Sequence, residues 1–127
     1  MEILNEIKHF TPAQEGDVNV WFKAGRIDDF PVNGGACLKY KDMQIAVFNF
    51  SRRKEWYACQ NLCPHKMQMV LSRGMIGSIE GEPKVACPFH KKSFSLKTGE
   101  CLNAEECSIA VFPVRIEDGF VHVGFRQ

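Results

Sequence analysis

The amino-acid sequence predicts an all-β fold, built as an antiparallel β-sandwich or partial barrel. Three observations favour this fold class. Apolar residues alternate with polar ones in short segments, turn residues separate these segments at roughly regular spacing, and no long stretch has the 3.6-residue periodicity of an amphipathic helix. A chain of 127 residues suits one domain with a single core.

Four strands are expected in the first half of the chain, where aromatic and β-branched residues are concentrated. They are residues 19–24, 36–40, 44–50 and 55–59. Residues 41–43 join the second strand to the third, and the polar turn 51–54 separates the third from the fourth. This succession of strand and turn predicts an antiparallel sheet.

The clearest hairpin lies near the end of the chain. Residues 114–117 and 120–123 flank Asp118-Gly119, a dipeptide that suits a tight turn with two positive φ angles. With a period of two, one face of this hairpin is apolar and the other is polar. The apolar face is expected to consist of Val114, Ile116, Val121 and Val123, and the polar face of Arg115, Glu117 and His122.

The remaining segments are less regular. A short strand is expected at 84–86, after the turn residues 80–83, and the segment 66–71 is compatible with one turn of helix. Residues 1–17 have no clear pattern and are assigned to an N-terminal arm, so the domain itself is expected to span residues 18–127.

The bulk composition argues against several classes of protein. A hydrophobic fraction of 45% and a charged fraction of 24% are ordinary for a globular protein and argue against disorder. The net charge of +1 gives no general attraction to nucleic acid or to an anionic membrane. No apolar run approaches the ~20 residues that span a bilayer, and the first residues lack the basic start and apolar stretch of a signal peptide. We therefore expect a cytoplasmic protein without membrane or nucleic-acid partners.

Two short loops carry the chemistry of the sequence, Cys63-Pro64-His65 and Cys87-Pro88-Phe89-His90. Each loop has one thiol and one imidazole, and the proline after each cysteine stiffens the backbone. Two sulfur and two nitrogen donors are the ligand set of a Rieske-type iron–sulfur cluster. The intervening residues 66–86 are numerous enough to run out and back as a hairpin, which would bring the two loops face to face.

A zinc site is the alternative, because zinc also accepts two thiolates and two imidazoles around one ion. Zinc sites usually pair Cys with Cys and His with His, whereas each loop here is mixed. A mixed loop suits two irons, since each loop can give its thiolate to one iron and its imidazole to the other. A zinc-stabilised interaction module without a redox role remains open.

The other histidines and cysteines are expected to be structural. His9 and His122 have no thiol nearby in the sequence, so neither is expected to bind metal. Four cysteines lie outside the two loops: Cys37, Cys59, Cys101 and Cys107. In a reducing cytoplasm we expect these four to be free thiols, mostly buried as small apolar side chains.

With these residues in view, the sequence resembles a Rieske domain, whose pattern is Cys-x-His, a spacer and Cys-x-x-His. The matching residues are Cys63, His65, Cys87 and His90. Residues 71–74 and 94–100 resemble the family's segments after the first and second loops. The long spacer and the stretch 87–101 most resemble the small subunit of assimilatory NAD(P)H-dependent nitrite reductase.

The resemblance implies a Rieske-like fold, in which antiparallel sheets form the body and about residues 60–100 form a small cluster-binding part. It implies a 2Fe-2S cluster that transfers electrons. The implied partner is a large subunit that carries flavin, sirohaem and its own iron–sulfur centre and reduces nitrite to ammonia in nitrate assimilation. The small subunit would be part of an oxidoreductase but not catalytic alone. A Rieske ferredoxin that serves an aromatic-ring oxygenase is the alternative within this family.

The resemblance also implies a low reduction potential. High-potential Rieske proteins have an extra cysteine in each ligand loop and serine and tyrosine hydroxyls that bond to the cluster sulfurs. The extra cysteine of each ligand loop is absent here, and Lys92 and Phe94 occupy the positions of the serine and the tyrosine. We therefore expect a potential of roughly −150 mV rather than +300 mV. Lys66, Lys91 and Lys92 directly follow the ligands and are candidates for a basic collar that steers an acidic partner.

Overall fold

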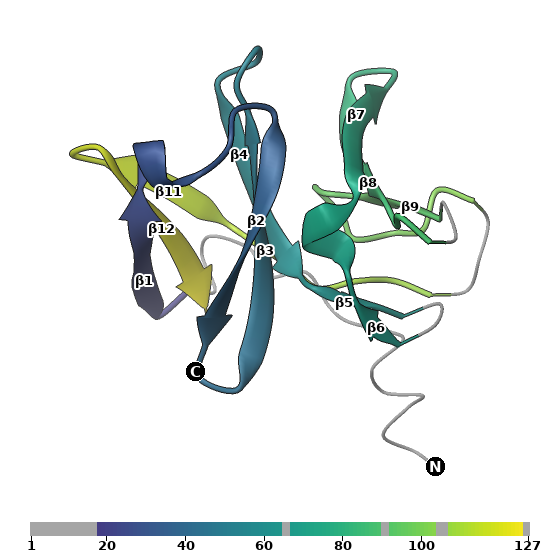
Figure 1. The fold of residues 1–127 in the computed structure, drawn as a ribbon, viewed down its shortest axis with the longest axis horizontal. Helices are drawn as coiled ribbons and strands as arrows, with labels where there is room; N and C mark the ends of the chain where they lie inside the picture. Colours follow the sequence, from purple (N-terminus) through teal and green to yellow (C-terminus); the bar gives the residue numbers. More distant parts are fainter. Residues whose placement is uncertain (1–17, 65–66, 90–91, 104–106, 126–127) are drawn as a thin grey trace.

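The computed structural model describes residues 18–64, 67–89, 92–103 and 107–125, and its regular elements are β-strands and short 3₁₀ turns, which confirms the all-β prediction. Figure 1 shows a larger body beside a smaller group of strands. The strands of the body are β1 (Val20–Arg26), β2 (Gly34–Tyr40), β3 (Met43–Phe50), β4 (Glu55–Gln60), β10 (Val111–Phe112), β11 (Val114–Glu117) and β12 (Phe120–Phe125). The turn η2 (Ile27–Asp29) follows β1. The predicted N-terminal arm, residues 1–17, lies outside the described residues.

The smaller group is called the small region below. It consists of β5 (Leu62–Cys63), β6 (Gln68–Met69), η3 (Leu71–Arg73), β7 (Met75–Ile79), β8 (Glu82–Ala86) and β9 (Ser93–Ser95). Its strands form a two-stranded sheet, β5-β6, and a three-stranded sheet, β7-β8-β9. The β7–β8 hairpin turns at Glu80-Gly81, where both φ angles are positive, so the chain between the two ligand loops does run out and back. No helix in the described ranges is long and apolar enough to cross a membrane.

The body is a sandwich of two antiparallel sheets with strand orders β1-β12-β11 and β10-β4-β3-β2. Strands β1 and β12, from opposite ends of the chain, lie side by side (Figure 1). The predicted turn at Asp118-Gly119 is confirmed, because Glu117 pairs with Phe120 and the two residues between them have φ angles of 52° and 80°. The register places Val114 opposite Val123 and Ile116 opposite Val121, so the four residues of the predicted apolar face do lie on one face of the hairpin.

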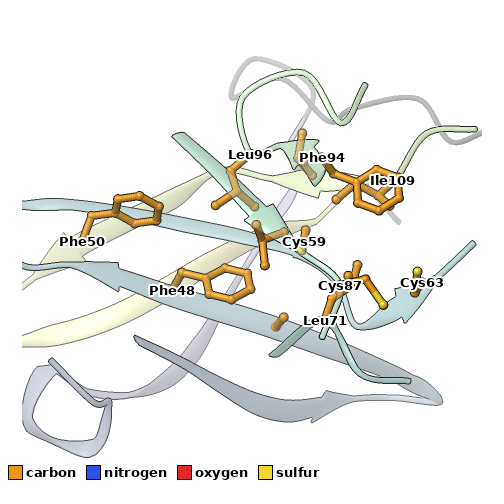
Figure 2. Packing of buried hydrophobic residues seen from close by; sticks show 12 residues of the cluster. Phe48, Phe50, Cys59, Cys63, Leu71, Cys87, Phe94, Leu96 and Ile109 are labelled. Atoms are coloured by element: carbon orange, nitrogen blue, oxygen red, sulfur yellow. The ribbon is translucent and has the colours of Figure 1, made fainter. Parts of the chain in front are cut away.

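Strand β3 is buried on both faces and therefore belongs to two cores. Ile45 and Val47 point into the core between the two sheets of the body. The alternate residues Ala46, Phe48 and Phe50 point into a second core, which lies between this sheet and the small region. Figure 2 shows this second core, which Val85, Phe94, Leu96 and Ile109 complete from the other side. The small region is thus anchored on the outer face of the sandwich.

Two sequence predictions are wrong. Residues 66–71 do not supply a turn of α-helix, because Gln68 and Met69 form β6 and the helical turn is the 3₁₀ turn η3 further along. The four extra cysteines are not mostly buried: only Cys59 is, whereas Cys37 is exposed on the edge strand β2 and the other two are half-buried. All six cysteines lie among the described residues, and no disulfide joins any two of them.

Candidate metal centre

The two predicted thiol ligands lie at the ends of strands that belong to the two different sheets of the small region. Cys63 is the last residue of β5, and Cys87 directly follows β8. Their exposed fractions are 0% and 1%, and both belong to the second core. Figure 2 shows both side chains at the end of this core opposite Phe50. The structure therefore places two of the four predicted ligands in the same core, while His65 and His90 lie outside the described residues.

Each ligand loop is closed at its base by backbone pairing. Cys63 pairs with Gln68 across β5 and β6, and the first loop lies between these two residues. The Cys87 N–H donates a 2.8 Å hydrogen bond to the Lys92 carbonyl, which closes the second loop. Backbone pairing therefore fixes the two ends of each loop, and each loop begins at a buried thiol.

The donor set fits an iron–sulfur cluster. Sulfur ligands suit soft or borderline metals, and a Rieske centre combines two thiolates with two imidazoles. Within the described part of the chain, no three His, Cys, Asp or Glu side chains gather in a group that could hold a metal ion. In the sequence, the two loops also contain the imidazoles of His65 and His90, which lie outside the described residues.

Gln60 and Asn61, which the sequence analysis did not single out, hold the first loop in place. The Gln60 side chain donates to the Leu62 carbonyl at 2.8 Å and accepts from the Ala110 N–H at 2.7 Å. The buried Asn61 side chain accepts from the Ser72 N–H at 2.7 Å and donates to Gln44 Oε1 at 3.0 Å. These two amides tie the start of the ligand loop to the body and to η3. The only sequence signal is a polar pair directly after a buried strand.

The residues after the second loop are held by a separate network. The Ser93 N–H donates to Asn103 Oδ1 at 2.7 Å, and the buried Ser95 hydroxyl donates to Glu82 Oε2 at 2.6 Å. The Ser95 hydroxyl therefore donates its hydrogen to this carboxylate and is not available to donate to a cluster sulfur. Gly99 closes the following turn with φ of +82°, and a Cβ there would collide with the Ile109 carbonyl. Phe94 is fully buried in the core.

Three exposed apolar side chains surround the ligand loops, and we call them the apolar rim. Phe89 is 59% exposed in the second loop, Met69 is 47% exposed on β6 beside the first, and Met75 is 76% exposed opposite Ala86, the residue before Cys87. Of the predicted basic collar, Lys92 is half-buried, and Lys66 and Lys91 lie outside the described residues.

A surface cavity of about 340 Å³ lies between the β3–β4 turn and β7, and none of the predicted ligands lines it. It is lined by Asn33, Phe50, Arg52, Arg53, Ile76, Gly77 and Ser78. Arg53 bridges the two sides, because its guanidinium donates to the Gly81 carbonyl at 2.9 Å and pairs with Glu55 at 3.1 Å.

Comparison with known proteins places these features in a family. The model of the Rieske-like 2Fe-2S domain matches residues 20–124. The small subunit of nitrite reductase (NADH) from Escherichia coli (strain K12) is 34% identical over 103 residues, which cover 81% of this chain and 95% of that protein. Nitrite reductase [NAD(P)H] from Emericella nidulans is 41% identical over 101 residues, which cover 76% of this chain but only 9% of that protein.

This chain is also similar to a solved structure and to the ferredoxin subunit of an oxygenase. The NMR structure of the E. coli protein NirD has a TM-score of 0.76 and 32% identity, and the match covers 85% of this chain and 98% of that one. The ferredoxin subunit of 3-phenylpropionate/cinnamic acid dioxygenase from Shigella flexneri is 33% identical over 107 residues, which cover 83% of each chain.

Proposed function

The chain belongs to the Rieske-like 2Fe-2S domain family, and from this membership we propose that it transfers electrons through a 2Fe-2S cluster held by Cys63, His65, Cys87 and His90. The observation that carries the proposal is the placement of two buried thiols, each at the start of a closed loop, at one end of the same core. When bound, such a cluster supplies one-electron transfer without the loss or gain of other atoms.

The protein's own contribution is to hold the ligands and to control access to them. Burial of Cys63 and Cys87 keeps water from the sulfur side of the site, and the body-linked amides of Gln60 and Asn61 fix the loop from which Cys63 projects. The imidazole ends of the two loops would then form the exposed edge, where electrons enter and leave. We assign the Rieske domain to residues 18–127 and its cluster-binding part to about residues 60–100.

We propose that the electron-transfer partner is the large subunit of an NAD(P)H-dependent nitrite reductase, with flavin, sirohaem and an iron–sulfur centre, which reduces nitrite to ammonia. The similarity to nitrite reductase small subunits along nearly their whole length supports this partner. The apolar rim beside the ligand loops supplies a surface on which such a partner can dock. In this scheme the chain is one subunit of the enzyme and has no catalytic residue of its own.

An oxygenase ferredoxin is the second candidate, because a dioxygenase ferredoxin subunit is 33% identical over 107 residues, although the ferredoxins fit less well than the nitrite reductase small subunits do. Reconstitution separates the two partners. The chain is mixed with a nitrite reductase large subunit or with a terminal oxygenase, and electron delivery from NAD(P)H is followed in each mixture. Faster nitrite reduction with the first and no oxygenase turnover with the second is the expected result; the reverse would assign the chain to the oxygenases.

Metal analysis and electron paramagnetic resonance of the anaerobically purified, dithionite-reduced chain test the cluster itself. We expect two irons and two acid-labile sulfides per chain and a Rieske-type signal. Cys63→Ser and Cys87→Ser are expected to abolish both, whereas Cys37→Ser, which changes an exposed thiol outside the ligand loops and keeps an acceptor for the Asn61 side chain, is expected to retain them. One zinc and no sulfide per chain would overturn the proposal in favour of the zinc module.

The potential is a second readout of the same site. Phe94 has no hydroxyl and the Ser95 hydroxyl donates to Glu82, so Ser93 is the one nearby serine whose hydroxyl could still donate to the reduced cluster. Protein-film voltammetry is expected to give roughly −150 mV. A value well above zero would show that hydroxyl donors reach the cluster after all.

A further inference from the structure

Cys101 and Cys107, which the proposed cluster does not use, each directly adjoin one residue of an isolated bridge in the chain that follows β9. Glu100 and Ser108 form an antiparallel bridge, and the Ile109 N–H donates a 2.8 Å hydrogen bond to the Gly99 carbonyl. Continuing this register by one residue sets Cys101 against Cys107. Sequence spacing alone does not show this, because the pairing depends on how the chain returns after residue 103.

The register also determines how far apart the two residues lie. Along an antiparallel pair of strands, the Cα–Cα distance between directly opposite residues alternates between narrow and wide. A residue pair next to a narrow one is therefore wide, with Cα atoms about 5.5 Å apart. The hydrogen bond between Ile109 and Gly99 flanks the Glu100–Ser108 pair and marks that pair as the narrow one. At about 5.5 Å, the Cα atoms of Cys101 and Cys107 would be within the range that a disulfide spans, and their Cβ atoms, about 5.5 Å apart in a wide pair, would have to approach each other by about 1 Å.

The two thiols lie on the same face of this ladder. Both Cys101 and Cys107 pack against the second core, as do Phe94, the partner of Cys101 on its other side, and Ile109, two residues beyond Cys107. Directly opposite side chains on one face are in contact distance. Both cysteines are half-buried and not fully buried, so a small thiol reagent can reach them.

The pair is connected to the second ligand loop by hydrogen bonds. The Leu102 N–H donates to the Ser93 carbonyl at 2.8 Å, and the Ser93 N–H donates to Asn103 Oδ1 at 2.7 Å. The residue before Ser93 is Lys92, whose carbonyl accepts the hydrogen bond from the Cys87 N–H. The segment that starts at Cys101 therefore supports the strand that closes the loop of a predicted cluster ligand.

We propose that Cys101 and Cys107 form a reversible dithiol–disulfide pair whose oxidation holds the second ligand loop in place. In the oxidation step the two thiols lose two protons and two electrons and the Sγ–Sγ bond forms. A low-molecular-weight disulfide such as oxidised glutathione takes up these protons and electrons, its own S–S bond breaks, and it leaves as two thiols. The existence of the pair is independent of the proposed function, whereas its effect on the cluster rests on that function.

The pair is tested on the full, cluster-loaded chain in anaerobic glutathione buffers of graded redox ratio, quenched with an alkylating reagent. Trypsin cleaves after Lys97 and next after Arg115, so both cysteines fall in one peptide. In oxidising buffers this peptide is expected to lose two hydrogens and to carry neither label nor glutathione. Alkylation or separate glutathione adducts on both cysteines at every ratio would overturn the disulfide.

Two other cysteines of the chain serve as internal controls. Cys37 is exposed and is expected to carry glutathione in the oxidising buffers. Cys59 is fully buried, and burial raises the pKa of its thiol, so it is expected to stay unmodified until the chain is denatured. In the Cys107→Ser variant, Cys101 has lost its partner and is expected to form a glutathione adduct instead of an internal bond.

The effect on the ligand loop is measured by the rate at which an iron chelator bleaches the visible absorption of the cluster. Oxidised wild type is expected to lose iron several-fold more slowly than reduced wild type, and Cys107→Ser is expected to show no such difference. Equal rates for the two wild-type forms would overturn the coupling. The peptide result decides the disulfide even if the chain holds no cluster, so failure of the pair and failure of the proposed function are distinguishable.

Discussion

The body and the small region are held together in different ways. In the body, β2, β3 and β4 pair in register from end to end, and aromatic rings fill the space between the sheets, with Tyr40 stacked on Phe125 at 4.0 Å. In the small region the strands are short, and side chains such as Asn61 and Ser95 hold the backbone by hydrogen bonds. The body therefore depends on packing between long paired strands, whereas the candidate site combines the second core with polar contacts to the backbone.

This difference has a consequence for stability and function. Apolar packing over long strands gives a cooperative unit, whereas short strands with few ladder hydrogen bonds open at lower cost. The ligand loops belong to the second kind of structure, as functional loops on a rigid scaffold commonly do. We expect the small region to open, and the cluster to be lost, before the body unfolds.

The largest expected effect comes from the core of the body. Phe125 is buried and packs against the rings of Tyr40, Phe22 and Phe112. Phe125→Ala is expected to lower the free energy of unfolding by about 3–5 kcal/mol, because it removes apolar contacts and leaves a cavity. Urea unfolding followed by circular dichroism measures this loss, with Phe125→Leu as the milder control. We expect the variant to lose its iron before its body unfolds. If iron is lost only at the rate at which the body unfolds, the two regions do not open separately.

A smaller effect on stability, but a larger one on the site, is expected at Asn61. Asn61→Ala leaves the Ser72 N–H without its acceptor and removes the tie to Gln44, at a cost of about 1–3 kcal/mol. We expect faster iron release at urea concentrations that leave the body folded. Gln44→Ala removes only the second of these bonds and is expected to do less. Should both variants release iron at the wild-type rate, polar contacts would not be what holds the first loop.

The smallest effect concerns alkaline pH at the boundary between the regions. Tyr57 contacts Phe50 edge-on and donates a 2.8 Å hydrogen bond to Glu55, and burial together with this carboxylate raises its pKa to about 12. The raised pKa means that the neutral phenol is favoured in the folded state, so its contribution is complete below pH 10 and is lost as the pH rises towards 12. Because Tyr57 is half-exposed, the change is expected to be small.

Urea midpoints of wild type and Tyr57→Phe, compared at pH 8 and pH 11, isolate this contribution. The wild type is expected to lose more stability than the variant between the two values, since the variant has no phenol to ionise. Parallel losses in the two proteins would show that Tyr57 is not the group responsible.

Much of the body could be predicted from the sequence, because its signals are local. Asp118-Gly119 predicts its turn by backbone preference alone, and the alternation in residues 114–123 predicts which face is apolar. The small region was harder. Strands β5, β6 and β9 have only two or three residues, too few for a periodic pattern, and they exist because tertiary pairing creates them.

The sequence by itself determined the chemistry of the candidate site, because two thiols and two imidazoles at mixed spacing specify a ligand set whatever surrounds them. Only the tertiary structure decided which groups hold that site. The bond from the Ala110 N–H to Gln60 joins residues far apart in the chain, and the bridge between Glu100 and Ser108 joins the segments that contain Cys101 and Cys107. Such contacts depend on how distant segments pack, and no local preference of the residues encodes them.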